Sequence, residues 1–269
     1  MTDHEVFGTD EQRALLRRGR AMAELVAGDP RYSYYGRTVG LMTPEDGDLD
    51  RLSALIRVQG NASYAAVPTD DAAAIAGDLT ARGFVPVRYD TWEGGADALE
   101  AARDVVARHE LPDDLTLVTL DAATAPGTVA SFAAMALGCG VLPLSGDVMR
   151  GAAGPAICVA AVDGAGAVMS CAASAAYAHP DHPTCGGQAW WGMLATDPAR
   201  RGERLALILG AHAMLEMARR FELSRFMTGV ARGNAPSEAV CRRMGLAVAG
   251  HEVVGAADPG ALAGGRMTK

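Results

Sequence analysis

Hydrophobic and polar residues follow two different periods along the first 112 residues. Apolar residues spaced three and four apart predict helices, whereas strict alternation predicts half-buried strands. On this basis we expect helices at 10–27, 49–58, 71–82 and 95–109, and strands at 37–42, 63–67 and 85–92. The first helix is expected to stop at the Gly-Asp-Pro of 28–30, because proline cannot continue a helix.

The same two periods continue after residue 112. They predict helices at 126–139, 203–221 and 235–244, a short helix or turn at 146–150, and strands at 115–120, 156–162, 167–176, 188–196, 225–231 and 247–254. Asp163-Gly164 is expected to join two of these strands in a hairpin. Residues 256–269 are rich in glycine and alanine, and we expect a loosely held end there. Strands that alternate with helices in this way predict an α/β fold.

Two parts of the chain have the same order of elements, which suggests an internal repeat. GLMTPEDGDLDRLSALI at 40–56 takes the place in the first part that GMLATDPARRGERLALIL at 192–209 takes in the second. In both parts a strand, a helix and a strand follow. The alternative is that any segment alternating strands and helices looks alike. The Leu-Pro-Asp-Asp at 111–114 is the expected boundary, so we predict domains at 1–112 and 113–269.

The stretch LATDPARRGERLALIL at 194–209 has the properties of an anion-binding loop. A predicted strand ends there, a Pro-bounded turn follows, and an apolar helix begins directly after the loop. The loop holds three arginines and a glycine, namely Arg200, Arg201, Gly202 and Arg204. A helix start has unpaired N–H groups and partial positive charge, and guanidinium groups bind phosphate oxygens well. The loop therefore predicts a phosphate or pyrophosphate site.

This loop resembles the acetyl-CoA loop of the GCN5-related N-acetyltransferase (GNAT) family. In that family an apolar tripeptide ends a strand, Asp-Pro follows, and Arg/Gln-x-x-Gly-x-Gly/Ala opens a helix. The matching residues here are Leu194, Ala195 and Thr196, then Asp197-Pro198, then Arg201, Gly202, Glu203, Arg204, Leu205 and Ala206. Arg204 stands where the family has its central glycine. Because its side chain is cationic, we expect it to pair with the pyrophosphate.

A second element of the family pattern, Asn-x-x-Ala-x-x-x-Tyr-x-x-x-Gly-Phe, lies downstream. The chain has Asn234 and Gly245-Leu246 in place, with Ser237 for the alanine and Cys241 for the tyrosine. The resemblance covers roughly residues 113–256. It implies a GNAT fold, a mixed, mostly antiparallel twisted sheet flanked by helices, in the C-terminal half. It also implies acetyl-CoA as co-substrate, held by residues 194–196, residues 201–206 and Asn234.

The N-terminal half is then a partial, GNAT-like α/β repeat. Its loop has the opposite charge, because carboxylates stand where the second loop has arginines, at Glu45, Asp46, Asp48 and Asp50. Four carboxylates would repel a pyrophosphate. We therefore expect the first repeat to be degenerate and not to bind the coenzyme.

Composition restricts the class of protein further. With 269 residues and 49% hydrophobic residues, the chain can fill one large or two ordinary cores. It has no run of about 18 apolar residues, and its first residues are acidic and polar, unlike a signal peptide. Its five cysteines include no Cys-x-x-Cys pair, so we expect neither a disulfide framework nor a metal site. These features predict a cytoplasmic protein that does not bind membranes.

Charge is distributed unevenly along the chain. Residues 1–112 carry a net charge of −7 and residues 113–269 a net charge of −1, whereas residues 196–243 alone carry +4. The local positive excess coincides with the predicted anion loop. Because no other part of the chain is basic, we expect no nucleic-acid partner. The expected partner is a small-molecule or peptide amine, and a homodimer is left open.

The residues for acid–base chemistry are harder to identify. Many GNAT relatives have a carboxylate on the central strand, but none occurs between Gly187 and Thr196. Cys241 is a candidate proton donor for the leaving thiolate, or else an ordinary core residue. His179 and His182, with Asp181 between them, are candidates for the base, or else part of a polar turn.

Aromatic residues near the expected site allow two interpretations each. Trp190 and Trp191 are neighbours on the central strand and must point to opposite faces, one into the core and the other toward the acceptor. The tyrosine-rich run at 32–35 is interpreted as a packing surface, with a ligand contact as the alternative.

These features predict an acetyl-CoA-dependent N-acetyltransferase that acts by direct attack of an amine in a ternary complex. One alternative is a non-catalytic acyl-CoA-binding protein with the same fold. Another is an enzyme that uses a longer acyl-CoA or an acceptor other than an amine.

Overall fold

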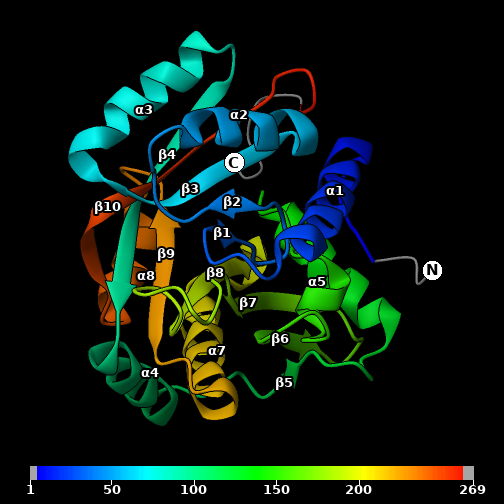
Figure 1. Ribbon diagram of the computed structural model, residues 1–269. Coiled ribbons are helices and arrows are strands. Elements are labelled where there is room, and N and C mark those ends of the chain that lie inside the picture. The colour runs from blue at the N-terminus through cyan, green and yellow to red at the C-terminus, as the bar shows by residue number, and fades with distance from the viewer. Residues whose placement is uncertain (1–4, 263–269) are drawn as a thin grey trace.

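The computed structural model describes residues 5–262 and forms one continuous ten-stranded sheet flanked by helices (Figure 1). The strand order is β1-β2-β3-β10-β4-β9-β8-β7-β6-β5. The fold is therefore α/β, as predicted, and most strand pairs are antiparallel. None of the described helices is long and apolar enough to cross a bilayer.

Within the described residues, the N-terminal half (5–112) contains four helices and four strands. The helices are α1 (Asp10–Val26), α2 (Asp48–Gln59), α3 (Thr69–Ala81) and α4 (Ala96–Arg108). The strands are β1 (Tyr32–Ser33), β2 (Gly40–Leu41), β3 (Asn61–Pro68) and β4 (Val85–Gly94). The strand predicted at 37–42 is shorter than expected, because residues 34–39 form the loop that connects the neighbouring antiparallel strands β1 and β2.

The C-terminal half, residues 113–262, follows the predicted order closely. Its strands are β5 (Leu115–Thr119), β6 (Ala156–Asp163), β7 (Val168–Ala176), β8 (Gln188–Thr196), β9 (Arg225–Val230) and β10 (Ala247–Ala257). Its helices are α5 (Pro126–Gly138), α6 (Gly146–Met149), α7 (Leu205–Phe221) and α8 (Ala235–Arg243), with a 3₁₀ turn η1 (Pro198–Arg200) before α7.

In the middle of the sheet, the last strand of each half pairs with strands of the other half. In each half a strand, a helix, a strand, a helix and a strand follow one another, as β2-α2-β3-α3-β4 and β8-α7-β9-α8-β10. In each the first two strands are parallel, and the last strand lies beside the second strand of the other half. Thus β10 lies between β3 and β4, and β4 lies between β10 and β9. The common order agrees with the predicted repeat, while the boundary at residue 112 stays a prediction.

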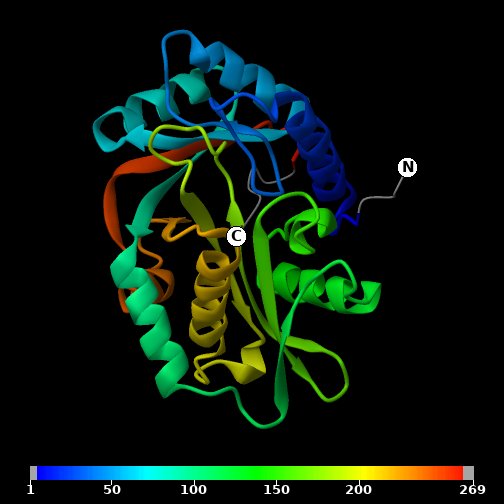
Figure 2. The same ribbon diagram turned by 60° about the horizontal axis from the view of Figure 1, so that its bottom comes forward.

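Helices cover the two faces of the sheet and bury separate clusters. Helices α4 and α7 lie side by side over one face of the C-terminal half (Figure 2), and Trp191 is part of the cluster that they bury. Helix α5 packs on the other face with Trp190. Helices α2 and α3 cover β3 and β10.

The end of the chain differs from the prediction of a loose tail. Strand β10 continues to Ala257, which is fully buried and pairs with both Asn61 and Val85. Leu262 is 3% exposed and packs with Leu15. Small residues let this segment fit closely between two strands, so its Gly and Ala content reflects tight packing rather than looseness. The rest of the predicted tail, 263–269, lies outside the described residues.

Candidate functional site

The central strands β8 and β9 separate and open a cleft in the sheet. Their parallel pairing runs from Gln188↔Arg225 to Trp190↔Met227 and goes no further. A cavity of about 270 Å³ lies at this opening. Its walls include Trp190 and Leu194 of β8 and Thr228 of β9. Beyond Trp190, the edge of β8 that faces β9 is therefore available to a ligand.

A bulge in β8 shapes the wall of the cavity. Ala195 pairs with Cys171 of β7, but Gly192 pairs with Ala173, so β8 has one extra residue in this stretch. Met193 lies in the bulge with a φ of 54°, in the left-handed region that non-glycine residues seldom adopt. The bulge turns the β8 backbone toward the cavity at the point where β9 leaves it.

The predicted anion loop follows directly from β8. Helix α7 begins at Leu205, and Arg204 precedes it with a φ of 60° and no side-chain cap. Gly202 has a φ of 91°, a value that glycine adopts without strain. No side chain caps the start of α7, and residues 201–204 just before it are exposed.

The three arginines of the loop differ in what they bind. Arg200 forms ion pairs with Asp114 at 2.7 Å and with Glu203 at 2.9 Å. The Arg200 guanidinium lowers the pKa of Asp114 below its usual value. Arg200 is therefore already neutralised, which corrects the expectation of three anion-binding arginines. Within residues 5–262, Arg201 and Arg204 form no ion pair, so the loop offers two cations.

Asn234 and Cys241 lie on the other side of the cavity, at helix α8. Asn234 precedes the helix, and its Oδ1 accepts a hydrogen bond from the Ser237 backbone N–H at 3.3 Å. Cys241 is 2% exposed and contributes to the core beneath the cavity wall. Burial raises the pKa of the Cys241 thiol to about 12.

The two candidate histidines lie outside this cavity, in the connection between β7 and β8. His179 Nδ1 accepts a hydrogen bond from the Asp181 N–H at 3.1 Å, and His182 Nδ1 accepts one from the Cys185 N–H at 3.1 Å. Both side chains thus organise a turn, and burial lowers the pKa of His182. The structure brings Leu194, Asn234 and Cys241 to one cavity but does not bring the two histidines there.

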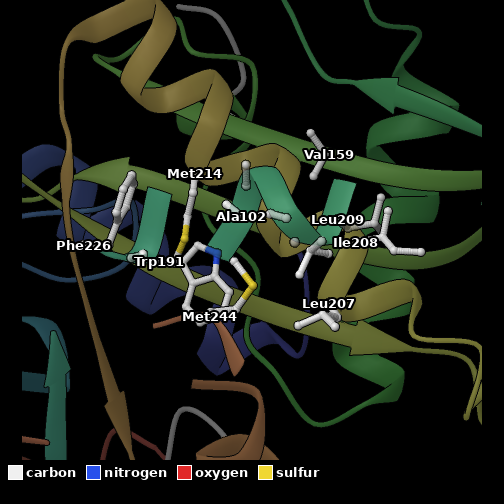
Figure 3. Close-up of a cluster of buried hydrophobic side chains, with 14 of the residues drawn as sticks. Ala102, Val159, Trp191, Leu207, Ile208, Leu209, Met214, Phe226 and Met244 are labelled. Atoms are coloured by element: carbon white, nitrogen blue, oxygen red, sulfur yellow. The ribbon is translucent and has the colours of Figure 1, made fainter. Parts of the chain in front are cut away.

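The paired tryptophans point to opposite faces, as predicted. Trp191 is fully buried beneath α7, among Met214, Phe226 and Met244 (Figure 3), and its indole N–H donates to the Gly210 carbonyl at 3.0 Å. Trp190 lies on the other face and lines the cavity.

The N-terminal half supplies a wall of the cavity that the sequence did not reveal. The Tyr35 ring stacks on Trp190 with ring centroids 4.8 Å apart. Arg37 approaches both rings, at 5.5 Å from the centroid of Tyr35 and 5.4 Å from that of Trp190. The tyrosine-rich run at 32–35 was the one signal in the sequence, and its alternative interpretation as a ligand contact pointed in this direction.

The wall of the cavity is more apolar than polar, and it includes no acidic group among the described residues. Hydroxyl and amide groups face it from Ser33, Asn61, Ser63, Tyr89, Thr228 and Asn234. Neither a carboxylate nor an imidazole is among the described residues that line it. Tyr177 also lines it, but its hydroxyl donates to Gln188 Oε1 at 2.5 Å and burial raises its pKa well above the usual value. No group of three or more potential metal ligands occurs within residues 5–262.

Several solved structures with a similar fold are described as GNAT proteins. A GCN5-related N-acetyltransferase from Kribbella flavida matches over 94% of this chain and 98% of its own, with 16% identity and a TM-score of 0.56. A GCN5-related N-acetyltransferase-like protein from Streptococcus suis matches over 90% and 99%, with 15% identity and a TM-score of 0.52. A tandem GNAT protein from the clavulanic acid biosynthesis pathway matches over 78% and 67%, with 18% identity and a TM-score of 0.52.

The fold and the opened central strands define an α/β protein with a mixed, mostly antiparallel sheet that opens between β8 and β9. More specifically, the chain has the GNAT fold, in the two-part form that a tandem GNAT protein also has. No protein family model matches the sequence, and no curated protein sequence matches it.

Proposed function

We propose that this protein transfers the acetyl group of acetyl-CoA to an amine, by direct attack in a ternary complex. One observation carries the proposal. The open edge of β8 is followed, after a short loop, by the start of helix α7, and the loop holds two arginines, Arg201 and Arg204, that form no ion pair within residues 5–262. A ligand that has a polar, extended chain and an anionic diphosphate would fit both parts at once.

The coenzyme would lie along β8. The diphosphate would bind the Arg201 and Arg204 side chains and the N–H groups that open α7. The pantetheine chain would follow the backbone of residues 194–196, where a chain can add hydrogen bonds to an open strand edge. Asn234 would contribute through its amide nitrogen, because its Oδ1 already caps α8.

In the reaction the neutral amine attacks the thioester carbonyl carbon, a C–N bond forms and the C–S bond breaks, and the proton that the nitrogen loses passes through water to the departing thiolate of CoA. The Met193 bulge would hold the carbonyl near the opening of β8 and β9. Alignment of the two reactants alone can supply about 7–11 kcal/mol of the barrier reduction. A site with few acid–base groups can therefore still accelerate this transfer.

The proposed source of this proton is the attacking nitrogen, which becomes acidic as it bonds to the carbonyl carbon, with water as the relay and without Cys241. An ordinary thiol has a pKa of about 8.5, whereas the pKa of Cys241 is raised to about 12. Proton transfer from Cys241 to a thiolate of ordinary basicity would thus be uphill by about 5 kcal/mol. Water can reach the leaving group through the cavity.

A second candidate function is acyl-CoA binding without catalysis. The observation that favours it is the absence of a carboxylate or imidazole among the described residues of the cavity wall. Most free amines are protonated at neutral pH, so a protein without a base has to rely on the small neutral fraction.

Two measurements on the same sample distinguish the candidates. Calorimetry measures acetyl-CoA binding, and a thiol-reactive chromogen measures CoA release with a panel of amines. Binding together with amine-dependent release supports the transferase. Binding without release for any amine supports the second candidate, and lack of binding contradicts both.

A further inference from the structure

Arg37 is a buried cation in the wall of the cavity. Arg37 is 6% exposed, and the Nε and one Nη of its guanidinium have no hydrogen-bond partner within residues 5–262. A guanidinium removed from water loses strong hydration, and its N–H groups normally regain partners in the protein. Two unpaired nitrogens at such a depth indicate that a ligand supplies the acceptors.

The surroundings of Arg37 compensate its charge only in part. The rings of Tyr35 and Trp190 lie 5.5 and 5.4 Å from it, and their π faces attract a cation. Aromatic faces leave the in-plane N–H donors of a guanidinium unused. The described residues that line the cavity include no aspartate or glutamate that could accept from these donors.

The main chain around Arg37 is fixed by contacts on both sides. The Gly36 carbonyl accepts a hydrogen bond from the Ser145 N–H at 2.9 Å, and the Gln59 side chain bonds both the N–H and the carbonyl of Val39, at 2.7 and 3.0 Å. Helix α1 packs against Arg37 so closely that a Cβ at Gly19 would lie 1.9 Å from the Arg37 carbonyl oxygen. The cation is thus held at the cavity by a rigid backbone.

We propose that Arg37 binds a carboxylate of the acceptor, so that the substrate is a small amine that also carries a carboxylate, such as an amino acid. The inference rests on the proposed function and names its acceptor class. A guanidinium offers two parallel N–H donors that match the two oxygens of a carboxylate. Ser33, Asn61 and Ser63 are further polar groups that line the cavity.

The size and place of the cavity favour a small acceptor. Its volume of about 270 Å³ is close to the lower end of the range for small-molecule sites. Both Arg37 and Met193 of the β8 bulge line this cavity. A carboxylate at Arg37 would thereby place the amine of a short molecule toward the thioester, while Arg201 and Arg204 remain for the coenzyme.

The test compares acceptors that differ only in the carboxylate. Amino acids with α-, β- and ω-amino groups are assayed beside their carboxamides, and kcat/KM is measured from CoA release. We expect the wild type to prefer the acids. Arg37→Gln should lower kcat/KM for the acids by about 10- to 100-fold, the loss typical of one charge-assisted contact, and should leave the carboxamides and the KM for acetyl-CoA unchanged. Arg37→Lys should restore part of the preference.

The matched control is Arg57→Gln. Arg57 is an exposed cation that lies 5.3 Å from the ring of Phe84, away from the cavity. Its removal changes the net charge equally and should leave the preference for acids unchanged. Thermal unfolding of each variant with and without acetyl-CoA shows whether it is folded and loaded.

Thermal shifts separate failure of this inference from failure of the proposed function. Acids, but not the matching carboxamides, should raise the melting temperature of the wild type and not that of Arg37→Gln, even if no amine is acetylated. Turnover with equal preference for acids and carboxamides would overturn the inference and keep the transferase. A loss of acetyl-CoA binding in folded Arg37→Gln would also overturn it, because Arg37 would then belong to the coenzyme site. If neither turnover nor an Arg37-dependent thermal shift is observed, the inference is overturned as well.

Discussion

Arg200 and Asp114 form an ion pair at 2.7 Å that ties the loop before α7 to the segment leading into β5. Glu203 holds the same guanidinium from the other side. Arg200 is thus occupied by two carboxylates, while its neighbour Arg201 has no such partner in the described chain. Two adjacent arginines consequently have different roles, and each can be removed separately.

The first prediction follows from this difference. Arg201→Ala should weaken acetyl-CoA binding by about 10- to 100-fold, because a charge-assisted hydrogen bond contributes about 1.5–3 kcal/mol. Arg200→Ala is the matched control and should change the affinity by less than about threefold, since exposed ion pairs contribute little. Calorimetry measures both. Equal losses in the two variants would contradict the assignment of the loop.

The second prediction concerns the stoichiometry of binding. Helix α2 begins with Asp48 and Asp50, and Asp48 is buried against Arg51. Carboxylates at this helix start repel a diphosphate, whereas the start of α7 attracts one. Calorimetric titration should therefore give one acetyl-CoA per chain. Replacing Glu45 and Asp46, which are outside the buried pair, by Gln and Asn should not add a second site; two sites in the wild type would refute the degenerate first repeat.

A third prediction concerns Cys241. Cys241→Ala should lower the free energy of unfolding by about 1–2 kcal/mol, because it removes a buried sulfur, and should leave kcat of the folded protein within about twofold. With a thiol pKa of about 12, no limb of the pH–rate profile below about pH 10 should depend on this residue. Chemical denaturation and the profile measure the two effects. A tenfold or greater fall in kcat of fully folded protein would make Cys241 the acid.

A fourth prediction concerns the packing of α1 against the segment that carries Arg37. Gly19→Ala should destabilise the protein by about 1–3 kcal/mol, because the added methyl group would overlap the Arg37 carbonyl and force the backbone apart. It should also raise the KM for carboxylate acceptors more than the KM for acetyl-CoA.

The control for this substitution lies in another helix. Gly77 of α3 is exposed, and nothing lies within 4 Å of a Cβ built there, so Gly77→Ala should stabilise by about 0.5–1 kcal/mol. Thermal unfolding distinguishes the two outcomes. A harmless Gly19→Ala would show that α1 does not fix the position of Arg37.

Local features of the sequence predicted the local structure well. Strand β8 matches its expected bounds, because an uninterrupted apolar run is bounded by Gly186-Gly187 on one side and Asp197-Pro198 on the other. The start of α7 was likewise encoded in a few consecutive residues. Such signals depend on neighbours in the chain, which a sequence displays directly.

Contacts between distant residues could not be predicted in the same way. The Arg37 guanidinium lies over the Trp190 ring, although more than half of the chain separates the two residues in sequence. Nothing in the sequence near either residue identifies the other as its partner. The neutralisation of Arg200 depends on Asp114, which lies far from it in sequence. The position of β10 between β3 and β4 is also a long-range pairing, and it converts a glycine- and alanine-rich segment into the interior of the sheet.

Strands β4 and β10 pair only with strands of the other half, which has a consequence for any attempt to produce half of this protein. A fragment cut at residue 112 would leave β9 without β4 and β10 without either neighbour, and its exposed edges would invite aggregation. Each piece holds the strand that the other lacks, so the two pieces produced together have the complementarity needed to reassemble. The chain is thus a natural scaffold for a split reporter, in which recovery of acetyl-CoA binding signals that two fused proteins have met.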